Sequence, residues 1–313
     1  MADPRALATR LGSLPVRLEG VRCRSGRVAL ADYPGGRPFT LVALSGAGHT
    51  GYGEHVAFGD RAQQAFVNSV EGLLATASGP VASIVRAEVA GYDRAALEGA
   101  LIDLALRQAG ASLADLCGVA EAPLRWVRSF AARPVGAAGA VKVDVEPRWS
   151  DAEIEALRAE PVVILDFKEA GDAALCARLS AAFPAAIFED PPAGCRHPRV
   201  ARDRPLLAEA DVAAAVARGE LVNLKAPRLG GFLPVLGALG AAGTSGYFGG
   251  MFEAGPGREQ SRALAALFCP EAPNDLAPLA GGLTAMSGES PSVIRLDAPG
   301  FAATCDWTEL EIA

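Results

Sequence analysis

Short apolar runs repeat along the chain after Pro123, and this repetition constrains the fold more than any other feature of the sequence. The runs are separated by Ala-rich stretches or by Gly/Pro turns, and in order they are LRWVRSF, GAVKVDV, PVVILDF, AAIFED, RPLLAEA, LVNLKAP and GYFGGMFEA. Continuous apolar runs of this length are typical of parallel strands that are buried on both faces. Roughly seven or eight such strands alternating with helices predict a closed α/β barrel.

Charged residues lie at or near the ends of these runs. In a barrel enzyme the active site forms at the carboxyl ends of the strands, where the connecting loops converge. One charged residue at a strand end is most simply a solvated terminus, but charges on strand after strand favour a site at the barrel mouth. The residues concerned are Lys142, Asp144, Asp166, Glu189, Glu209, Lys225 and Glu253.

Three of these residues are carboxylates on successive predicted strands: Asp166, Glu189 and Glu209. Oxygen ligands from separate rigid elements, with no His or Cys among them, are the ligands that Mg²⁺ prefers, and Mn²⁺ is the alternative. A metal ion held in this way can bind a carboxylate substrate directly. The sequence therefore predicts a metal site at the barrel mouth.

Two lysines flank these carboxylates along the chain, Lys142 before them and Lys225 after them. Beside a divalent cation the ammonium form of a lysine is disfavoured, so its pKa falls and it can act as a base near neutral pH. The metal would neutralise the enediolate that forms when the substrate loses its α-proton. Lysines at strand ends are usually just solvated, so this prediction depends on the neighbouring carboxylates.

The region before the barrel predicts a smaller α+β unit. The segments VRCRSGRVALADY and FTLVALSGAGHTGYGEHVAF alternate in hydrophobicity and contain turn glycines, which is typical of a β-meander. The segments QQAFVNSVEGLLATA and YDRAALEGALIDLALRQAGASLADLCG have apolar residues at the three- and four-residue spacing of amphipathic helices. We expect the second of these helices to end at Gly118.

Composition excludes several classes of partner. The 313 residues, half of them hydrophobic, suffice for a barrel and a smaller domain, and the net charge of −7 gives no basic surface for nucleic acid. No apolar stretch is long enough to span a membrane, and we expect a cytoplasmic protein. The six cysteines lack C-x-x-C spacing, so we expect buried reduced thiols and neither a zinc site nor a disulfide framework.

The ordered motifs resemble those of the enolase superfamily. The run LVNLKAPRLGGFLPVLGAL is similar to its lysine strand and Gly-Gly turn, AIFEDPP to a metal strand, and GYFGGMFEAGPGREQSRALAAL to the block that follows. The segments GYGEHVAF and RAALEGALIDLALRQAGASLADLCG resemble the cap of the muconate-lactonising subgroup, and SVIRLDAPGFA resembles its closing strand. The resemblance spans nearly the whole chain.

This resemblance implies a (β/α)7β barrel with an N-terminal α+β capping domain. The cap would comprise residues 1–122, completed by residues of about 290–313, and the barrel would comprise residues 123–289. The resemblance implies Mg²⁺, held by Asp166, Glu189 and a third carboxylate, with acid–base lysines. Around the substrate or behind these groups it places Asp144, Asn223, Gly250 and Glu253.

Two departures from the family pattern leave alternatives open. The family's Lys-x-Lys strand is Lys142-Val143-Asp144 here, so either Asp144 replaces the catalytic lysine or Lys142 is that lysine and Ala140 replaces the first. On the third metal strand, Glu209 is the ligand if Pro205 opens the strand, whereas the alternative register puts Ala208 there and removes the ligand. Lys168 also stands where the family commonly has asparagine, and its charge would compete with that of a metal.

The leading hypothesis is a metal-dependent lyase or isomerase that acts on a small carboxylic acid. Among the family's activities, the short length and compact cap most resemble o-succinylbenzoate synthase of menaquinone biosynthesis. A one-lysine site fits this syn dehydration, which can use one base twice. Dipeptide epimerase or N-acylamino acid racemase is the nearest alternative. A catalytically degenerate member that acts as a binding protein is the second hypothesis, motivated by Asp144, Lys168 and Ala208. The protein would be a monomer or a homo-oligomer.

Overall fold

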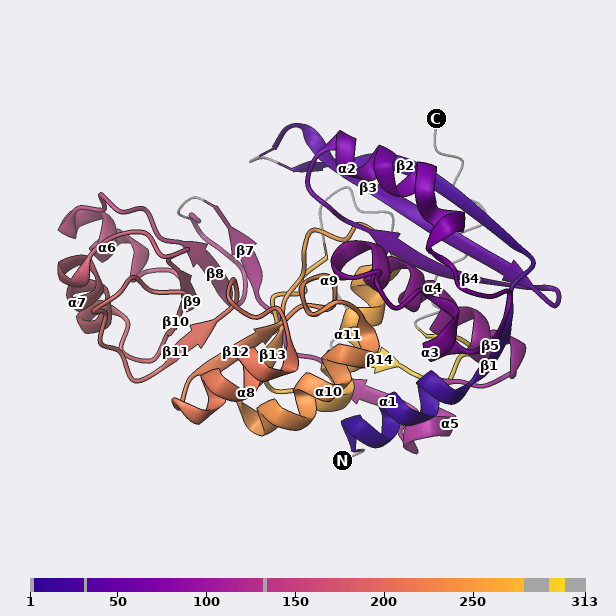
Figure 1. Ribbon diagram of the computed structural model, residues 1–313. Helices are drawn as coiled ribbons and strands as arrows, with labels where there is room; N and C mark the ends of the chain where they lie inside the picture. The colour runs from indigo at the N-terminus through magenta and orange to yellow at the C-terminus, as the bar shows by residue number, and fades with distance from the viewer. Residues whose placement is uncertain (1–2, 31–32, 132–133, 279–292, 302–313) are drawn as a thin grey trace.

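The computed structural model describes residues 3–30, 33–131, 134–278 and 293–301. Two parts lie side by side in Figure 1. One is an antiparallel meander of β2 (Gly20–Leu30), β3 (Tyr33–Gly46) and β4 (His49–His55), on which the long helix α4 (Gly91–Gln108) packs. The other is a sheet of parallel strands with helices on its outside. Both parts agree with the sequence-based prediction of a cap and a barrel.

Glycines on β4 allow α4 to approach the meander closely. A Cβ at Gly51 would lie 2.2 Å from the backbone nitrogen of Leu104, and a Cβ at Gly53 would lie 2.1 Å from the carbonyl oxygen of Ala96. Because any side chain at these positions would collide with the helix backbone, the alternating glycines of GYGEH are required for this packing. The predicted helix ending at Gly118 is divided into α4 and α5 (Leu113–Cys117).

The remaining elements of the first 123 residues are short. They are α1 (Pro4–Ser13), β1 (Pro15–Arg17), α2 (Asp60–Ser69), the 3₁₀ helix η1 (Val70–Leu73), β5 (Ser78–Pro80), α3 (Val81–Ile84) and β6 (Glu121–Pro123). Strand β6 pairs antiparallel with β14 (Val293–Arg295), which comes from the C-terminal part of the chain. The proposed boundary near residue 123 stays a prediction, and most of the C-terminal segment expected to complete the cap lies outside the described residues.

Among the described residues, seven parallel strands form the barrel sheet in chain order. They are β7 (Arg128–Phe130), β8 (Val141–Asp144), β9 (Val162–Asp166), β10 (Ile187–Glu189), β11 (Val200–Arg202), β12 (Leu221–Leu224) and β13 (Gly246–Phe248). The segment at Asn274 and Asp275 joins the two edges of this sheet. The Val127 N–H donates to the Asn274 carbonyl (2.8 Å), and the Asp275 N–H donates to the Phe248 carbonyl (2.8 Å). These bonds close the ring.

Helices cover the outside of most of the barrel. They are α6 (Asp151–Leu157), α7 (Ala173–Ala182), α8 (Glu209–Ala217), α9 (Ala226–Leu229), α10 (Phe232–Ala242) and α11 (Pro256–Phe268), with the 3₁₀ helix η2 (Gly243–Ser245) before β13. Among the described residues, the connections β7–β8 and β10–β11 contain no helix. The connection between β10 and β11 therefore supplies no helix to cover the outside of the barrel.

One predicted strand is wrong. The run RPLLAEA is a turn followed by the first residues of α8, and the fifth barrel strand is Val200–Arg202. The Asp211 carboxylate accepts hydrogen bonds from the backbone N–H groups of Leu207 (3.0 Å) and Ala208 (2.9 Å), so it caps the start of this helix. This local capping outweighs the apolar pattern of the run.

Two buried carboxylates tie the meander and α4 to the barrel helices. Glu54 on β4 accepts hydrogen bonds from the backbone N–H groups of Ala254 (2.6 Å), Gly255 (2.9 Å) and Gly257 (3.2 Å) around the start of α11. Glu98 on α4 accepts one from the Leu233 N–H (2.8 Å) at the start of α10. The first N–H groups of a helix have no partner inside the helix. At the starts of α10 and α11, a carboxylate from the cap accepts hydrogen bonds from backbone N–H groups.

The expectation of reduced cysteines is wrong for one pair. Cys176 on α7 and Cys195 in the β10–β11 loop form a disulfide with a Cα–Cα separation of 5.6 Å, although they are 19 residues apart in sequence. Such pairing depends on distance in space, which C-x-x-C spacing does not report. Cys23, Cys117 and Cys269 are free thiols, and Cys305 lies outside the described residues.

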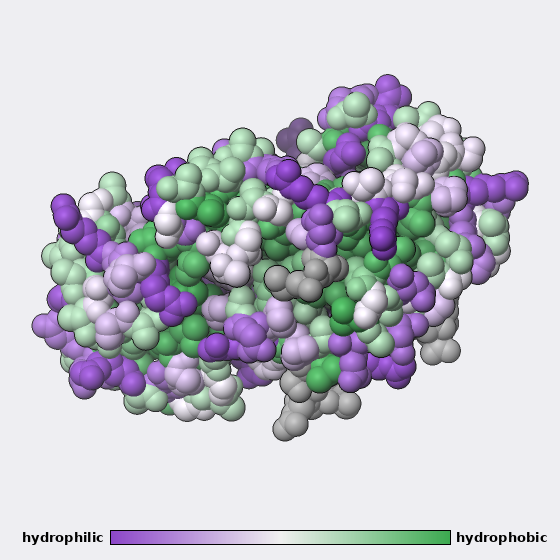
Figure 2. All heavy atoms as spheres, turned by 90° about the horizontal axis from the view of Figure 1, so that it is seen from below, coloured by the Kyte–Doolittle hydropathy of each residue, from purple (hydrophilic) through white to green (hydrophobic). Residues whose placement is uncertain are grey.

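Hydrophilic and hydrophobic residues are interspersed over the face in Figure 2. Within the described ranges, no helix combines the length and the apolar character needed to cross a bilayer.

Candidate functional site

The inner faces of the barrel strands change from apolar to charged toward their carboxyl ends. Ile164, Ile187 and Ala201 belong to one buried apolar cluster inside the barrel. Because side chains two residues apart share a strand face, the next inward positions are Asp166, Glu189 and Asp203. Asp166 and Glu189 are paired in register on β9 and β10. A layer of carboxylates therefore lies above the apolar layer, at the end of the barrel where sites form.

Lys142 on β8 is the cation at the centre of this layer. Its side chain is 4% exposed, and its Nζ lies 2.5 Å from Glu189 Oε1, 3.1 Å from Asp166 Oδ2 and 3.4 Å from Asp275 Oδ2. Burial acts to lower the pKa of this ammonium, but Asp166, Glu189 and Asp275 together raise that pKa well above its ordinary value. In this arrangement Lys142 is a counter-ion to these carboxylates, and its predicted role as a base stays a prediction.

Glu189 is fully buried and accepts hydrogen bonds from neutral donors as well. The Tyr247 hydroxyl donates to its Oε2 at 2.6 Å, and the Asn223 amide donates to its two oxygens at 3.3 Å and 3.2 Å. Burial, together with repulsion from Asp166 and Asp203, raises the pKa of Glu189 to about 7. Three carboxylates share the Lys142 ammonium, so this part of the site is short of positive charge.

Lys225, at the end of β12, forms a second buried ion pair in the layer. Its Nζ donates to Asp203 Oδ2 at 2.7 Å, and the Arg228 guanidinium lies 3.8 Å from the other oxygen of Asp203. Burial acts to lower the pKa of Lys225, but Asp203 outweighs it and the net direction is upward. The structure therefore brings both predicted lysines and two of the predicted carboxylates into one cluster.

The third predicted ligand, Glu209, is not part of this cluster. It is the first residue of α8, its side chain is 46% exposed, and it forms an ion pair with Arg5 of α1 on the outside of the barrel. Asp203, six residues before Glu209, takes the inward position instead, because the fifth strand is Val200–Arg202 and not the run RPLLAEA. Neither register considered for Glu209 and Ala208 is the one in the structure.

Asp144, two residues after Lys142, forms a pair above the buried layer. Its carboxylate accepts a hydrogen bond from the Lys168 ammonium, and the two side chains are 24% and 54% exposed. Lys168 and Glu169 both have a positive φ, +49° and +64°, which is uncommon for residues with side chains. Lys168 pairs with Asp144, whereas Lys142 contacts Asp166 and Glu189, so the two lysines contact different carboxylates.

The predicted substrate-side residues Gly250 and Glu253 lie after β13. Glu253 is buried, accepts a hydrogen bond from the Met251 N–H (2.9 Å) and lies 3.7 Å from the Arg258 guanidinium. A Cβ at Gly250 would lie 2.9 Å from Arg258 Nη2. Among the contacts of the described residues, neither joins the Lys142 cluster directly, and their role toward a substrate stays a prediction.

Sequence inspection missed four groups that the structure brings to the site: Asp203, Tyr247, Gly249 and Asp275. A Cβ at Gly249 would lie 2.3 Å from Asn223 Oδ1 and 2.6 Å from Lys225 Cε, so this position accepts no side chain without rearrangement. The Asp275 carboxylate also accepts a hydrogen bond from the Ser129 hydroxyl (2.5 Å). The Gly-Gly pair at 249 and 250 was a visible signal for close packing, but Asp275 lies in a segment with no strand pattern.

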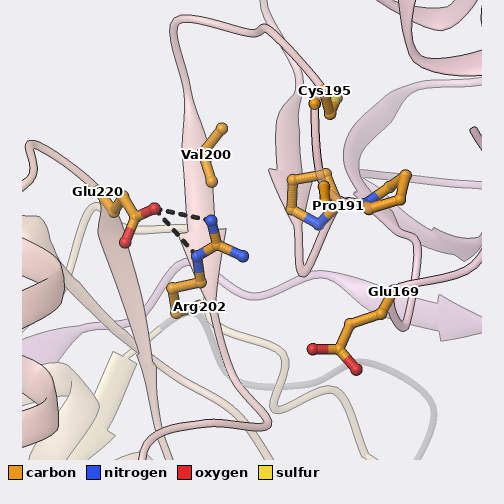
Figure 3. Close-up of a pocket in the computed structure, with 9 residues that line it drawn as sticks. Glu169, Pro191, Cys195, Val200, Arg202 and Glu220 are labelled. Carbon is orange, nitrogen blue, oxygen red and sulfur yellow. Dashed lines mark hydrogen bonds and ion pairs between the residues drawn. The ribbon is translucent and has the colours of Figure 1, made fainter. Parts of the chain in front are cut away.

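The pocket drawn in Figure 3 is separate from this cluster. It has a volume of about 540 Å³ and is lined by residues that include Glu169, Pro191, Cys195, Val200 and Arg202. Val200 and Arg202 flank the inward Ala201, so they point to the outside of the barrel. The Arg202 guanidinium donates to Glu220 on one side of the pocket (Figure 3). This hollow lies next to the β10–β11 connection, which contains no helix.

Comparison with known proteins defines the fold family. Residues 128–281 match a family model described as the C-terminal domain of a domain of unknown function, DUF8230. An enolase superfamily member from Listeria innocua Clip11262 is 19% identical, with a TM-score of 0.72 over 92% of this chain and 94% of that one. The chain has the enolase-superfamily fold. The predicted barrel with an N-terminal cap is confirmed.

Other solved structures with this fold have named activities. An L-Ala-D/L-Glu epimerase is 22% identical, with a TM-score of 0.64 over 91% of this chain and 98% of that one. MenC from Desulfotalea psychrophila LSv54 is 14% identical, with a TM-score of 0.60 over 90% of this chain and all of that one (100%). No curated protein sequence matches the chain. At these identities the likeness defines the fold alone.

A divalent cation fits the donor chemistry of the carboxylate layer. Asp166, Glu189 and Asp203 offer only oxygen, and the buried Oδ1 atom of Asp203 has no hydrogen-bond partner among the residues that the structure describes. The excess of carboxylates over ammonium groups favours a further positive charge. Among the residues that the structure describes, no three acidic, His or Cys side chains converge on one point, since Lys142 lies between Asp166 and Glu189. A galacturonate dehydratase mutant from Geobacillus sp., similar in fold, is complexed with Mg.

Proposed function

We propose that this protein is an enzyme that removes the α-proton of a small carboxylic acid, as a lyase or an isomerase. The observation that supports it most directly is the layer of buried lysines and carboxylates at the carboxyl ends of the barrel strands. Lys142 and Lys225 are each less than a tenth exposed and each contacts a carboxylate within 2.7 Å. Buried charges are costly to maintain, so a cluster at the barrel mouth favours a functional site over a structural one.

The proposal assigns a divalent cation, Mg²⁺ or Mn²⁺, to Asp166, Glu189 and Asp203. When bound, the cation would supply positive charge to the substrate carboxylate and to the enediolate. With the cation bound, the ammonium form of Lys225 would be disfavoured, so its neutral Nζ would take the α-proton, and Asp203 would orient it. Tyr247 and Asn223 would hold Glu189 in place through their hydrogen bonds. Asp203 takes the place of Glu209, so the proposed metal site still has three carboxylates.

Among specific reactions, we favour a syn dehydration of the o-succinylbenzoate synthase type. The supporting observation is the Asp144–Lys168 pair: Asp144 provides no second base on β8, and Lys142 is held by three carboxylates. One available lysine suffices for removing a proton and returning it to a leaving hydroxyl group on the same face. A dipeptide epimerase or an N-acylamino acid racemase needs a base on each face of the α-carbon and is the alternative.

Deuterium exchange at the α-carbon tests this proposal. The purified chain, supplied with Mg²⁺, is incubated in D₂O with N-succinyl amino acids, dipeptides and the o-succinylbenzoate precursor, and exchange is followed by NMR. We expect exchange or dehydration with one class, and we expect Lys225→Ala to reduce its rate at least about a hundredfold because general-base catalysis is typically worth that much. Glu209→Gln is the matched control and should leave the rate unchanged.

The second candidate is a binding protein without strong catalysis, and it has its own supporting observation. Lys142 already neutralises part of the carboxylate layer. Absence of exchange with every compound of the panel, in a folded protein that binds Mg²⁺, would favour this candidate. The proposed partner is in either case a small carboxylic acid, and a cytoplasmic location, a lack of nucleic-acid partners and a monomer or homo-oligomer remain part of the proposal.

A further inference from the structure

The most unusual contact in the site is that of Lys142 with the carboxylates assigned to the metal. Its ammonium lies between Glu189 Oε1 (2.5 Å) and Asp166 Oδ2 (3.1 Å), and its side chain is 4% exposed. These are two of the oxygens that would bind a cation directly. Metal–oxygen distances for Mg²⁺ are about 2.1 Å, so an ion bound to both of these oxygens would lie in the space between them that the Lys142 ammonium now occupies.

We propose that Lys142 is an internal competitor of the divalent cation, whose ammonium must leave Asp166 and Glu189 before a metal ion binds there. The proposal rests on the metal site of the proposed function and adds a property of this chain's own lysine. It predicts that metal affinity rises when Lys142 is removed, which is the opposite of what a residue that supports metal binding would show.

The surroundings of Lys142 favour displacement over a permanent block. The Asp275 carboxylate lies 3.4 Å from the same Nζ, is 16% exposed and is held by the Ser129 hydroxyl, so the ammonium keeps a counter-ion when it leaves the other two carboxylates. Glu189 keeps its hydrogen bonds from Tyr247 and Asn223, which are neutral and do not repel a cation. Metal binding therefore replaces the Lys142 ammonium by the ion at Asp166 and Glu189 and leaves the ammonium with Asp275 as its counter-ion.

Lys168 provides a matched control because it carries the same charge nearby. Its ammonium contacts Asp144, which is not among the proposed metal ligands, and only its backbone N–H contacts Asp166 (3.2 Å). If Lys142 acted only through its general charge, removing Lys168 would raise metal affinity to a similar extent. Direct competition for the same oxygens predicts a large rise in metal affinity only when Lys142 is removed.

Mn²⁺ binding to the full chain, measured by electron paramagnetic resonance of the free ion and by calorimetry, tests the proposal. We expect Lys142→Met to bind Mn²⁺ at least about tenfold more tightly than the unaltered protein, since it removes a cation in contact with the ligands. Lys168→Met should change affinity by less than about threefold, as expected for a partly exposed charge. Lys142→Arg, which keeps the charge, should bind no more tightly than the unaltered protein.

Folding of the variants is checked by thermal unfolding with and without Mn²⁺. Lys142→Met should be less stable than the unaltered protein without metal and should regain more stability on adding Mn²⁺, because the ion then replaces the lost counter-charge. If Lys142→Met does not fold, Lys142→Gln serves for the same comparison.

Three outcomes would overturn the proposal: equal or weaker Mn²⁺ binding by Lys142→Met, an equal gain by Lys168→Met, or no Mn²⁺ binding by any variant. These outcomes are independent of the proton-exchange assay. If α-proton exchange is seen but Lys142→Met does not bind Mn²⁺ more tightly, the competition of Lys142 with the metal is refuted and the proposed enzyme stands. If Lys142→Met binds Mn²⁺ more tightly but no α-proton exchange is seen, the competition stands and the proposed enzyme is refuted.

Discussion

Asp203 shows how one residue connects the chemistry of the site to the stability of the barrel. Its side chain is 8% exposed, it pairs with Lys225 at 2.7 Å, and its neighbours Asp190 and Glu189 are acidic as well. Burial acts to raise its pKa, but Lys225, Lys142 and Arg228 outweigh burial and lower that pKa below its ordinary value. A carboxylate in this position is needed in its charged form, because it is the close counter-ion of the buried Lys225.

Asp203→Asn and Glu209→Gln form a matched pair that tests which carboxylate belongs to the site. Asp203→Asn leaves Lys225 buried without a close opposite charge and should lower the free energy of unfolding by about 3 kcal/mol or more. Glu209→Gln alters a half-exposed pair with Arg5 and should cost less than about 1 kcal/mol. Urea denaturation followed by circular dichroism measures both. Equal losses would contradict the assignment of Asp203.

Individual elements are joined by carboxylates that lie at helix N-termini. Glu98 on α4 lies at the start of α10, where it accepts the Leu233 N–H and has Arg94 at 3.6 Å. A Cβ at Gly231 would lie 2.2 Å from its Oε2, so the turn before α10 requires glycine for this contact as well as for its φ of +138°. Burial raises the pKa of Glu98 to about 7 in spite of these donors.

This raised pKa predicts a dependence of stability on pH. Between the ordinary glutamate pKa of 4.5 and about 7, the folded protein keeps a proton on Glu98 that the unfolded chain has lost. Stability is therefore highest at the acidic end of this window and falls as pH rises toward 7. Glu98→Gln should remove the part of this decrease in the free energy of unfolding that Glu98 causes, on the order of 3 kcal/mol.

The measurement compares urea unfolding of the two proteins from pH 5 to pH 7.5, roughly the window that linkage assigns to this group. The exposed Glu155→Gln serves as the control and should not alter the pH profile, since its pair with Arg158 is on the surface. Parallel profiles for the unaltered protein and Glu98→Gln would show that Glu98 is already ionised in the folded state at the acidic end of the range.

On the scale of the whole molecule, the cap and the barrel share one core. A single apolar cluster includes Leu44 and Leu101 of the N-terminal part and Val222, Leu236 and Leu264 of the barrel part. Figure 1 shows α4 between the meander and the barrel helices. Glu54 adds a polar link, since it accepts three backbone hydrogen bonds around the start of α11. The two parts should therefore unfold together.

Glu54→Ala tests this link. It leaves three buried N–H groups without their acceptor and should lower the free energy of unfolding by roughly 3 to 5 kcal/mol, because each unsatisfied buried donor costs about 1 to 3 kcal/mol and the contacts are not additive. Differential scanning calorimetry should still show one transition, at a lower temperature. Glu71→Ala, at an exposed position on η1, is the control. An unchanged melting temperature for Glu54→Ala would contradict the role given to Glu54.

The sequence by itself determined the periodic part of this protein. Six of the seven apolar runs contain barrel strands, and the meander of the cap lies where alternation and turn glycines predicted it. Lys142, Asp166, Glu189 and Lys225 were identified because a strand face repeats every two residues, so a charge after a buried strand points to the barrel mouth. These features depend on local spacing, which one sequence contains in full.

Only the tertiary structure decided the partners of these residues. The run RPLLAEA is apolar enough for a strand, but its capping by Asp211 makes it the start of α8 and gives the inward position to Asp203. Asp275 and the Cys176–Cys195 disulfide likewise join segments that are distant in sequence. The place of Lys142 between two carboxylates follows from the packing of three strands, because distances across a barrel depend on closure and register and not on spacing along the chain.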